Sequence, residues 1–312
     1  MQGLVSGRSA GALLVHRVQD KVIEKLGGKA AAHVVLILAL VFALDTADKG
    51  AVGAMAKQLE STFDMSKAQL GTLATASGAV GAIAAIFFGW LVDRSRRTRV
   101  LAIAIVLWAG AMAASAGAVS YMYLLYTRLA IGALTAAAVP AVASLVGDYF
   151  PPAHRGKMYS YILAGEVIGA AFGLFIAGEL ALLSWRAGFL SIALPALGVA
   201  WLVERLPEPP RDGRGRIREG QERVDAWSSP EEVRESDQEQ DRSTQILRSM
   251  ARERQIEPRE ELISSEDPKD KSLWWAIGYV LRIPTNLLLI IASALGYYFF
   301  AGIRLFGLEY VN

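Results

Sequence analysis

Five of the ionisable residues in the sequence lie well inside segments that are otherwise almost entirely apolar. Asp45, Asp48 and Lys49 fall together in one segment, and Arg128 and Glu166 fall in two later ones. A charged group near the centre of a bilayer is costly, so such groups usually pair or face a water-filled cavity, and by default they indicate a functional site. A carboxylate whose surroundings change can also shift its pKa, and could then take up and release a proton.

The spacing of these residues suggests two pairs. Asp45 and Lys49 are four residues apart and share a helix face, so they could bind each other. The depth of Asp48 along its segment is similar to that of Arg128, so we expect these two to form a gating pair. Glu166 has no basic neighbour in its own segment, which makes it our candidate for the proton-coupling acid, with Asp45 as the alternative. For each residue the competing interpretation is a purely structural ion pair.

Apolar segments that are long enough to cross a bilayer must position these residues. A spanning helix needs about 20 apolar residues, and lipid offers the backbone no hydrogen-bond partners, so each span must be helical. The predicted fold class is therefore an all-α membrane protein, with a bundle of six helices and one further transmembrane helix. The seven expected spans are residues 33–56, 69–92, 100–117, 121–147, 158–182, 187–203 and 283–303.

A short, very basic loop joins the second and third expected spans. It reads GWLVDRSRRTRVL from Gly89 to Leu101 and contains four arginines. Positive loops next to spanning helices are retained on the cytoplasmic side. We therefore expect this loop and the N-terminus to be cytoplasmic in a multi-pass protein of the plasma membrane.

The charge distribution divides the chain into four parts. Residues 1–32 form a basic tail that we expect to be cytoplasmic, and residues 33–203 form the six-helix bundle. Residues 204–272 hold about half of all the charges, and such a composition is typical of a largely disordered linker. Residues 273–312 begin with two tryptophans, which favour an interfacial helix before the seventh span.

The composition excludes several classes of function. The sequence has no cysteine, and its three histidines have no ligand-like spacing, so we expect no disulfide and no metal site. No glycine-rich phosphate loop precedes a helix, and no nucleophile–base pair lies in the spans, so we expect no cofactor and no enzymatic activity. A net charge of +2 gives no indication of nucleic-acid binding.

Small residues recur every four positions on two of the expected spans. Such repeats allow helices in a membrane to approach closely, and they could also let the helices slide between conformations. One repeat consists of Gly165, Gly169 and Gly173 in the fifth span, and the other of Ala74, Gly78 and Ala82 in the second.

The basic loop resembles a signature of the major facilitator superfamily. In that signature a glycine is followed four residues later by an aspartate and then by a basic cluster, which Gly89, Asp93, Arg94 and Arg97 match. Arg96 stands where the general pattern has glycine, as in the spinster-like branch. The resemblance implies that the four matching residues latch a cytoplasmic gate.

Two further stretches resemble the same family. The sequence LDTADKG resembles the first helix of spinster-like members, with Asp48 and Lys49 in place of their aspartate–arginine pair. Arg128 followed by Gly132 resembles the second signature of the superfamily. Thr135 departs from the pattern, because spinster-like proteins usually carry a glutamate at that position.

The resemblance implies a secondary active transporter in which two six-helix halves rock about a midplane cavity, driven by protons or by exchange. Its partners would be a small-molecule substrate, such as an amphiphile, and the lipid bilayer. Family members have twelve spans and this chain has seven, so we expect the C-terminal half of the transporter to be missing here. The alternative is a non-transporting membrane scaffold or sensor whose cytoplasmic linker recruits a partner.

Overall fold

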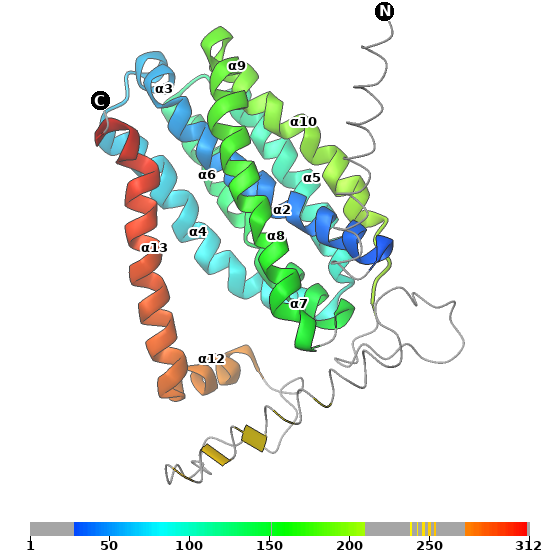
Figure 1. Cartoon of the computed structure of the whole chain (residues 1–312). Helices are drawn as coiled ribbons and strands as arrows, with labels where there is room; N and C mark the ends of the chain where they lie inside the picture. Colours follow the sequence, from blue (N-terminus) through cyan, green and yellow to red (C-terminus); the bar gives the residue numbers. More distant parts are fainter. Residues whose placement is uncertain are drawn as a thin grey trace, which may run out of the picture. The chain divides into compact units, whose positions relative to one another are not determined.

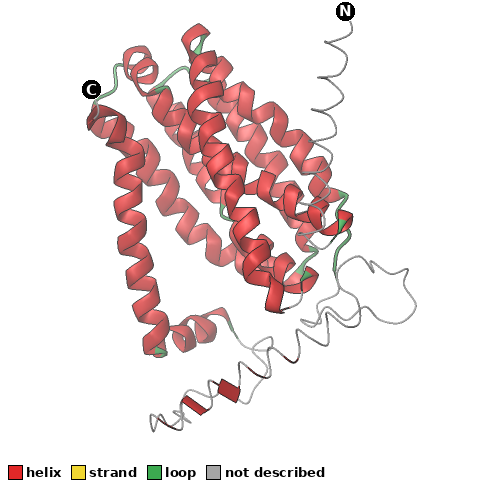
Figure 2. Ribbon diagram, in the orientation of Figure 1, coloured by secondary structure: helices red, strands yellow, loops and turns green. Residues whose placement is uncertain are grey.

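The computed structural model describes residues 28–150, 152–209 and 272–310, with isolated residues between 238 and 253. Most of the basic N-terminal tail and most of the charged linker therefore lie outside the described residues. The chain divides into two units, one up to residue 240 and one from residue 241 onward. All regular structure in the described ranges is helical (Figure 2), so the predicted all-α fold class is confirmed.

The first unit contains six stretches of helix that are long and apolar enough to cross a membrane. They run alongside one another (Figure 1). Their positions agree with the six predicted spans to within a few residues at most ends. The helices are α2 (Lys29–Ala54), α3 (Ala56–Phe63), α4 (Lys67–Arg94), α5 (Arg97–Ala116), α6 (Tyr121–Thr135), α7 (Ala138–Tyr149), α8 (Pro152–Phe172), a π-helix (Gly173–Ala177), α9 (Gly178–Leu183) and α10 (Trp185–Glu204).

Serine side chains begin three of these helices. The Ser66 hydroxyl accepts a hydrogen bond from the backbone N–H of Gln69, and the Gln69 side chain accepts one from the backbone of Ser66, which forms a capping box before α4. Ser120 and Ser184 cap α6 and α10 in the same way with one bond each. Each cap satisfies a backbone donor that the first helical turn leaves without a partner.

The predicted fourth span is interrupted. Helix α6 ends at Thr135 and α7 begins at Ala138, although together they pass as one span. Pro140 lies in the first turn of α7, where it has no N–H to bond back to the carbonyl of Ala136, and its ring crowds that carbonyl. The proline therefore accounts for the break.

Helix α8 and the π-helix approach α2 at backbone contact. A Cβ atom built on Gly165, Gly169 or Gly173 would lie 2.1, 2.0 or 2.0 Å from a carbonyl oxygen of α2. No side chain fits at that distance, so the four-residue glycine repeat lets the two helices pack closely. The Thr46 hydroxyl adds a hydrogen bond of 2.9 Å to the backbone carbonyl of Glu166.

The second small-residue repeat does not make the contact expected of it. A Cβ on Gly78 would meet no atom within 4 Å, and Ala82 is exposed. Helix α4 instead approaches α6 through Ser77 and Gly81, and a Cβ on Gly132 would lie 2.1 Å from the Ser77 carbonyl oxygen. Within the described residues no helix packs against Gly78, because a repeat identifies one face of a helix but not the partner that lies against it.

The helices of the bundle bury their residues very unevenly. About half of each spanning window of α2 and α5 is buried, whereas α4 buries almost none of its window and α8 about a fifth. Large apolar residues therefore remain exposed on two helices: Ile83, Ile86, Phe87 and Trp90 on α4, and Val167, Ile168 and Phe175 on α8 and the π-helix.

The second unit consists of α12 (Leu273–Arg282) and α13 (Pro284–Tyr310), which meet at a bend of 92°. The Ser272 hydroxyl caps α12 by accepting a hydrogen bond from Trp275. Ile283 has an extended backbone, as expected of a residue that precedes proline. Counted as one span, the bent pair gives up to seven spans in the described residues.

Candidate functional site

A buried ion pair joins the first and fourth spans. Nη1 of Arg128 on α6 donates a hydrogen bond of 2.6 Å to Oδ1 of Asp48 on α2. The two side chains are only 4% and 9% exposed. Removal of two charges from water is unfavourable unless they are well paired, so the pair holds both charges inside the bundle.

Three neutral groups complete the surroundings of Arg128. Nη2 donates to the Ser115 hydroxyl at 2.9 Å and lies 3.4 Å from the Met112 sulfur. The guanidinium carbon lies 4.9 Å from the centroid of the Phe189 ring, close enough for a cation–π attraction. Nε is buried and has no hydrogen-bond partner among the described residues. Asp48 therefore balances the positive charge of Arg128, and the other groups around the guanidinium, namely the Ser115 hydroxyl, the Met112 sulfur and the Phe189 ring, are neutral.

Asp45 and Lys49 form a second ion pair within α2. Nζ of Lys49 lies 2.6 Å from Oδ2 of Asp45, and the side chains are 50% and 24% exposed. This pair is far more accessible than the Asp48–Arg128 pair. The Asp45–Lys49 pair therefore lies at the surface of α2, and the Asp48–Arg128 pair lies in the interior of the bundle.

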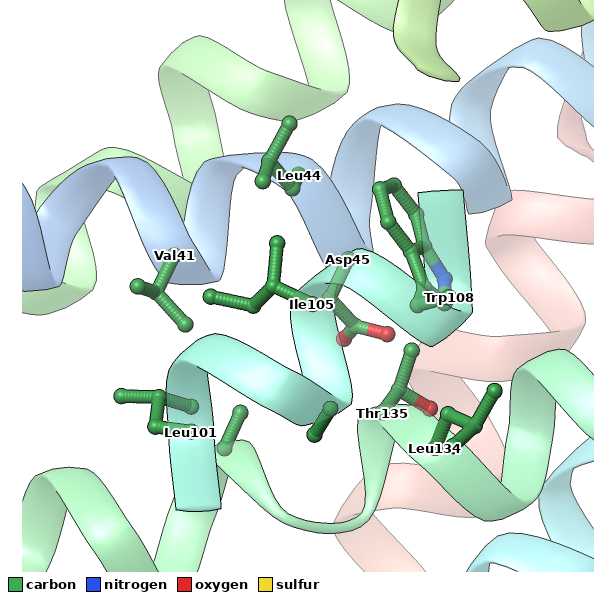
Figure 3. Close-up of a pocket in the computed structure, with 10 residues that line it drawn as sticks. Val41, Leu44, Asp45, Leu101, Ile105, Trp108, Leu134 and Thr135 are labelled. Atoms are coloured by element: carbon green, nitrogen blue, oxygen red, sulfur yellow. The ribbon is translucent and has the colours of Figure 1, made fainter. Parts of the chain in front are cut away.

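Asp45 also lines a small cavity between α2, α5 and the junction of α6 with α7. Figure 3 shows its carboxylate between the Trp108 ring and the Thr135 side chain. The other lining residues are apolar: Val41, Leu44, Leu101, Ala104, Ile105, Leu134 and Ala138.

Glu166 lies apart from both ion pairs. It is half-buried on α8, and its backbone carbonyl accepts the hydrogen bond from Thr46. Within the described ranges, no hydrogen bond or ion pair involves its carboxylate. The structure therefore does not join Glu166 to Arg128, and its role as the coupling acid stays a prediction.

The residues of the basic-loop motif divide into one buried and three accessible positions. Arg97 is buried, whereas Asp93 and Arg94 are exposed. The Arg94 guanidinium lies over the Trp90 ring, 4.8 Å from its centroid. A Cβ on Gly89 would meet no atom within 4 Å. The described part of the bundle thus engages only Arg97 in an ionic network.

Arg97 connects three parts of this end of the bundle. Its guanidinium forms an ion pair with Asp148 on α7 and another, of 2.8 Å, with Glu208 beyond α10. It also donates to the Ser144 hydroxyl at 3.1 Å and to the Pro209 carbonyl at 2.7 Å. Burial of this arginine is stabilised by partners on every side of its planar donor group.

Glu208 is a residue that sequence reasoning assigned to the linker. Its carboxylate accepts hydrogen bonds from the backbone N–H groups of Arg97 (3.0 Å) and Thr98 (2.9 Å), and from the Thr98 hydroxyl (2.8 Å). Those N–H groups begin α5, so Glu208 caps the helix and favours its positive end. Burial raises the pKa of the Glu208 carboxyl, but the bonds from Arg97 and Thr98 outweigh this effect and hold the pKa below its usual value.

One sequence signal could have found Glu208. Helix α5 has no side-chain cap of its own, and the first acid after the last bundle span, beyond Glu204 at its end, is Glu208. The first backbone N–H groups of a helix need hydrogen-bond acceptors, and a carboxylate at the same end of the bundle can supply them. No group of three or more acidic or histidine side chains in the described residues could hold a metal ion.

Comparisons with known proteins give the chain a family. Residues 38–310 match the family model described as Major Facilitator Superfamily. A niacin transporter from Acinetobacter baylyi is 28% identical over 219 residues, which cover 68% of this chain and 48% of that protein. A 4-hydroxybenzoate transporter from Pseudomonas aeruginosa is 31% identical over 181 residues, which cover 57% of this chain and 40% of that protein.

A solved structure is similar as well. The crystal structure of a bacterial homologue of the human lysosomal transporter Spinster, in an inward-facing and occupied conformation, is 25% identical to this chain. The similarity covers 58% of this chain and 45% of that one, with a TM-score of 0.51. The chain thus spans about half the length of the proteins that it matches.

The family match includes most of α2, the other five spans of the bundle and α13. It also supports the expectation of a membrane transporter family over an enzyme family. The chain is therefore a multi-pass integral membrane protein and a member of the Major Facilitator Superfamily.

Proposed function

We propose that this chain provides the N-terminal six-helix half of a secondary active transporter that works by alternating access. The observation that carries the proposal is the buried ion pair between Asp48 and Arg128. Charges inside a membrane bundle are retained chiefly where ions or substrates pass. The pair joins two spans in the bundle interior, so a change of partner for either charge would alter the contact between both helices.

The substrate class that we favour is a small organic acid, and an aromatic carboxylate in particular. Two relatives carry the names of niacin and 4-hydroxybenzoate transporters, and both compounds are aromatic acids. Two cations lie within the apolar spans described above, Lys49 at the surface of α2 and Arg128 inside the bundle, and each could exchange its aspartate for a substrate carboxylate. The likeness to a Spinster homologue keeps an amphiphilic substrate, and a place in the spinster-like branch, as the second candidate.

We further propose that the exposed faces of α4 and α8 receive the second half of the transporter. Both helices bury little of their surface within the bundle. The large apolar residues Phe87 and Val167 are 56% and 72% exposed, and such surfaces in a membrane protein face lipid or another helix. A second six-helix half packed there would enclose the cavity that alternating access requires.

The basic loop would form the gate at the cytoplasmic face, in line with the positive-inside rule. Arg97 would anchor the loop to the bundle through Asp148 and Glu208. Asp93 and Arg94, which are exposed, would then remain accessible to the second half when the gate closes. We expect closure to involve these two residues and opening to leave the Arg97 network intact.

Proton coupling would use Glu166, with Asp45 as the competing acid. Glu166 is half-buried, and no cation contacts its carboxylate in the described residues. Its carboxylate could therefore exchange a proton without first breaking an ion pair of the described residues. The Asp45 carboxylate lies 2.6 Å from the Lys49 ammonium and would have to leave that ion pair. The Asp48–Arg128 pair would gate the pathway and stay charged.

Uptake by the complete gene product tests these assignments. Proteoliposomes with an imposed pH gradient are supplied with labelled nicotinate, 4-hydroxybenzoate or a lysolipid, and accumulation of one of them is the expected result. Glu166→Gln should abolish pH-driven uptake but preserve exchange of internal for external substrate. If Glu166→Gln keeps the full pH dependence and Asp45→Asn loses it, Asp45 is the coupling acid. Absence of uptake and exchange for all three compounds would contradict the substrate proposal.

A further inference from the structure

The cavity beside Asp45 has a mostly apolar lining that includes three polar side chains. Seven of its ten lining residues are apolar, and the polar members are Asp45 on α2, Trp108 on α5 and Thr135 at the end of α6. Its volume is about 20 Å³, far too small for an organic substrate. Its polar groups therefore need an explanation other than contact with a bound substrate in this conformation.

The hydrogen-bonding groups around the cavity are incompletely satisfied. Trp108 is only 3% exposed, and its ring N–H has no hydrogen-bond partner among the described residues. An indole N–H can only donate, and burial without an acceptor is unfavourable. The Asp45 carboxylate is in contact with Lys49 through one oxygen, Oδ2. The Thr135 hydroxyl donates to the Gly132 carbonyl at 3.2 Å, which leaves its oxygen able to accept.

We propose that this cavity binds one water molecule, which links the Asp45 carboxylate to the Trp108 ring nitrogen and the Thr135 hydroxyl. A cavity needs about 10–15 Å³ to hold a water molecule, and the water needs two to four polar partners. The cavity exceeds this volume, and three polar side chains are among its lining residues. The water would accept from Trp108, donate to Asp45, and use its second hydrogen toward Thr135. It would give the buried indole the hydrogen-bond partner that the described residues do not provide.

The water would also connect Trp108 to the charge on Asp45. Lys49, on the same helix, is the one charged group that contacts Asp45 in the described residues. Arg128 is committed to Asp48, and the lining residues of α5, α6 and α7 carry no charge. A water that donates to a carboxylate is a better acceptor than one that donates to a carboxylic acid, because hydrogen bonds in a chain polarise one another. Protonation of Asp45 would therefore weaken the bond from the Trp108 N–H.

The resonance of the Trp108 indole N–H tests the proposal directly. The full 312-residue chain is labelled with ¹⁵N at its indole nitrogens, placed in lipid nanodiscs, and titrated with acid while ¹H–¹⁵N spectra are recorded. Trp108→Phe assigns the signal. We expect a cross-peak from the Trp108 N–H to water that persists at the slow exchange of a buried site, and a shift with one titration step. The exposed indole of Trp201 serves as the internal control and should not follow that step.

Three variants separate the water link from other causes. Asp45→Asn should remove the titration step but keep the water cross-peak, because the amide oxygen still accepts. Ala104→Val places two methyl groups at the cavity wall and should remove both the cross-peak and the step, while Thr135→Ser should keep both. A wild-type signal without water contact and without titration would overturn the proposal. So would a step that survives in Asp45→Asn or in Ala104→Val. The proposal concerns the interior of this chain and does not depend on transport.

Discussion

Substitution of Asp48 by asparagine removes the one carboxylate that the described residues place against Arg128. The change keeps the shape of the side chain and an oxygen that can accept the bond from Nη1, but it removes the negative charge. Arg128 is then a buried cation with the Ser115 hydroxyl, the Met112 sulfur and the Phe189 ring around it. The substitution thus isolates the contribution of charge pairing from that of packing.

The magnitude follows from the burial of the pair. Loss of one partner of a buried ion pair costs about 3–5 kcal/mol, because the other charge is left without compensation. The retained neutral hydrogen bond recovers about 1 kcal/mol. We therefore expect the free energy of unfolding to fall by about 2–4 kcal/mol, which lowers the ratio of folded to unfolded protein by a factor of about 30–900.

Reversible unfolding in mixed micelles, titrated with sodium dodecyl sulfate and followed by far-ultraviolet circular dichroism, measures this loss. The matched control is Lys49→Met, which breaks the more accessible pair with Asp45 and should cost less than about 1 kcal/mol. Combining Asp48→Asn with Arg128→Gln removes both charges and should destabilise less than the sum of the two single changes. A loss below about 0.5 kcal/mol for Asp48→Asn, or strict additivity in the double variant, would refute the assignment of a stabilising buried pair.

Three further outcomes are expected. Gly169→Ala places a methyl group 2.0 Å from a carbonyl oxygen of α2 and should lower the free energy of unfolding by at least about 1–3 kcal/mol in the same assay. The control Gly89→Ala should leave the free energy of unfolding nearly unchanged. Equal effects of the two substitutions would contradict the close packing of α8. The pKa of Glu208 lies below its usual value, so its contribution is complete above the unfolded pKa of about 4.3 and is lost as the pH falls through the folded pKa. The difference in stability between wild type and Glu208→Gln should therefore be constant near neutral pH and disappear in acid, and a difference that grows in acid would show the opposite sign. Asp93→Asn in the complete protein should lower transport with near-normal expression, since Asp93 is exposed and exposed pairs contribute only about 0–1 kcal/mol to stability; a collapse of expression would indicate a structural role instead.

Much of the fold could be predicted from the sequence because its main signals are local. The length of an apolar stretch decides whether it can span a bilayer, and lipid then requires that it be helical. The six bundle spans and the seventh apolar segment, residues 283–303, follow from that rule. The depth of Asp48 and Arg128 also follows from the sequence, because the rise of a helix per residue is fixed.

The contacts between helices were decided by the tertiary structure. The sequence identified the glycine face of α8, but not that α4 would meet Gly132 through Ser77 and Gly81. It assigned Glu208 to a linker, whereas the folded chain places that carboxylate on the start of α5. The rotation of each helix and the angle at which it crosses its neighbours depend on all the side chains packed between them, and no single segment encodes them.

For the same reason, a residue could be recognised as chemically important before its partners were known. The sequence determined that this chain carries charges inside a membrane bundle, because a charge in an apolar stretch is visible in one dimension. Only the packed bundle decided that Asp48 pairs with Arg128 in the interior, that Glu166 has no cation against it in the described residues, and that Asp45 lies beside the indole of Trp108. Those outcomes depend on distances of a few ångströms between helices, which residue spacing along one chain does not fix.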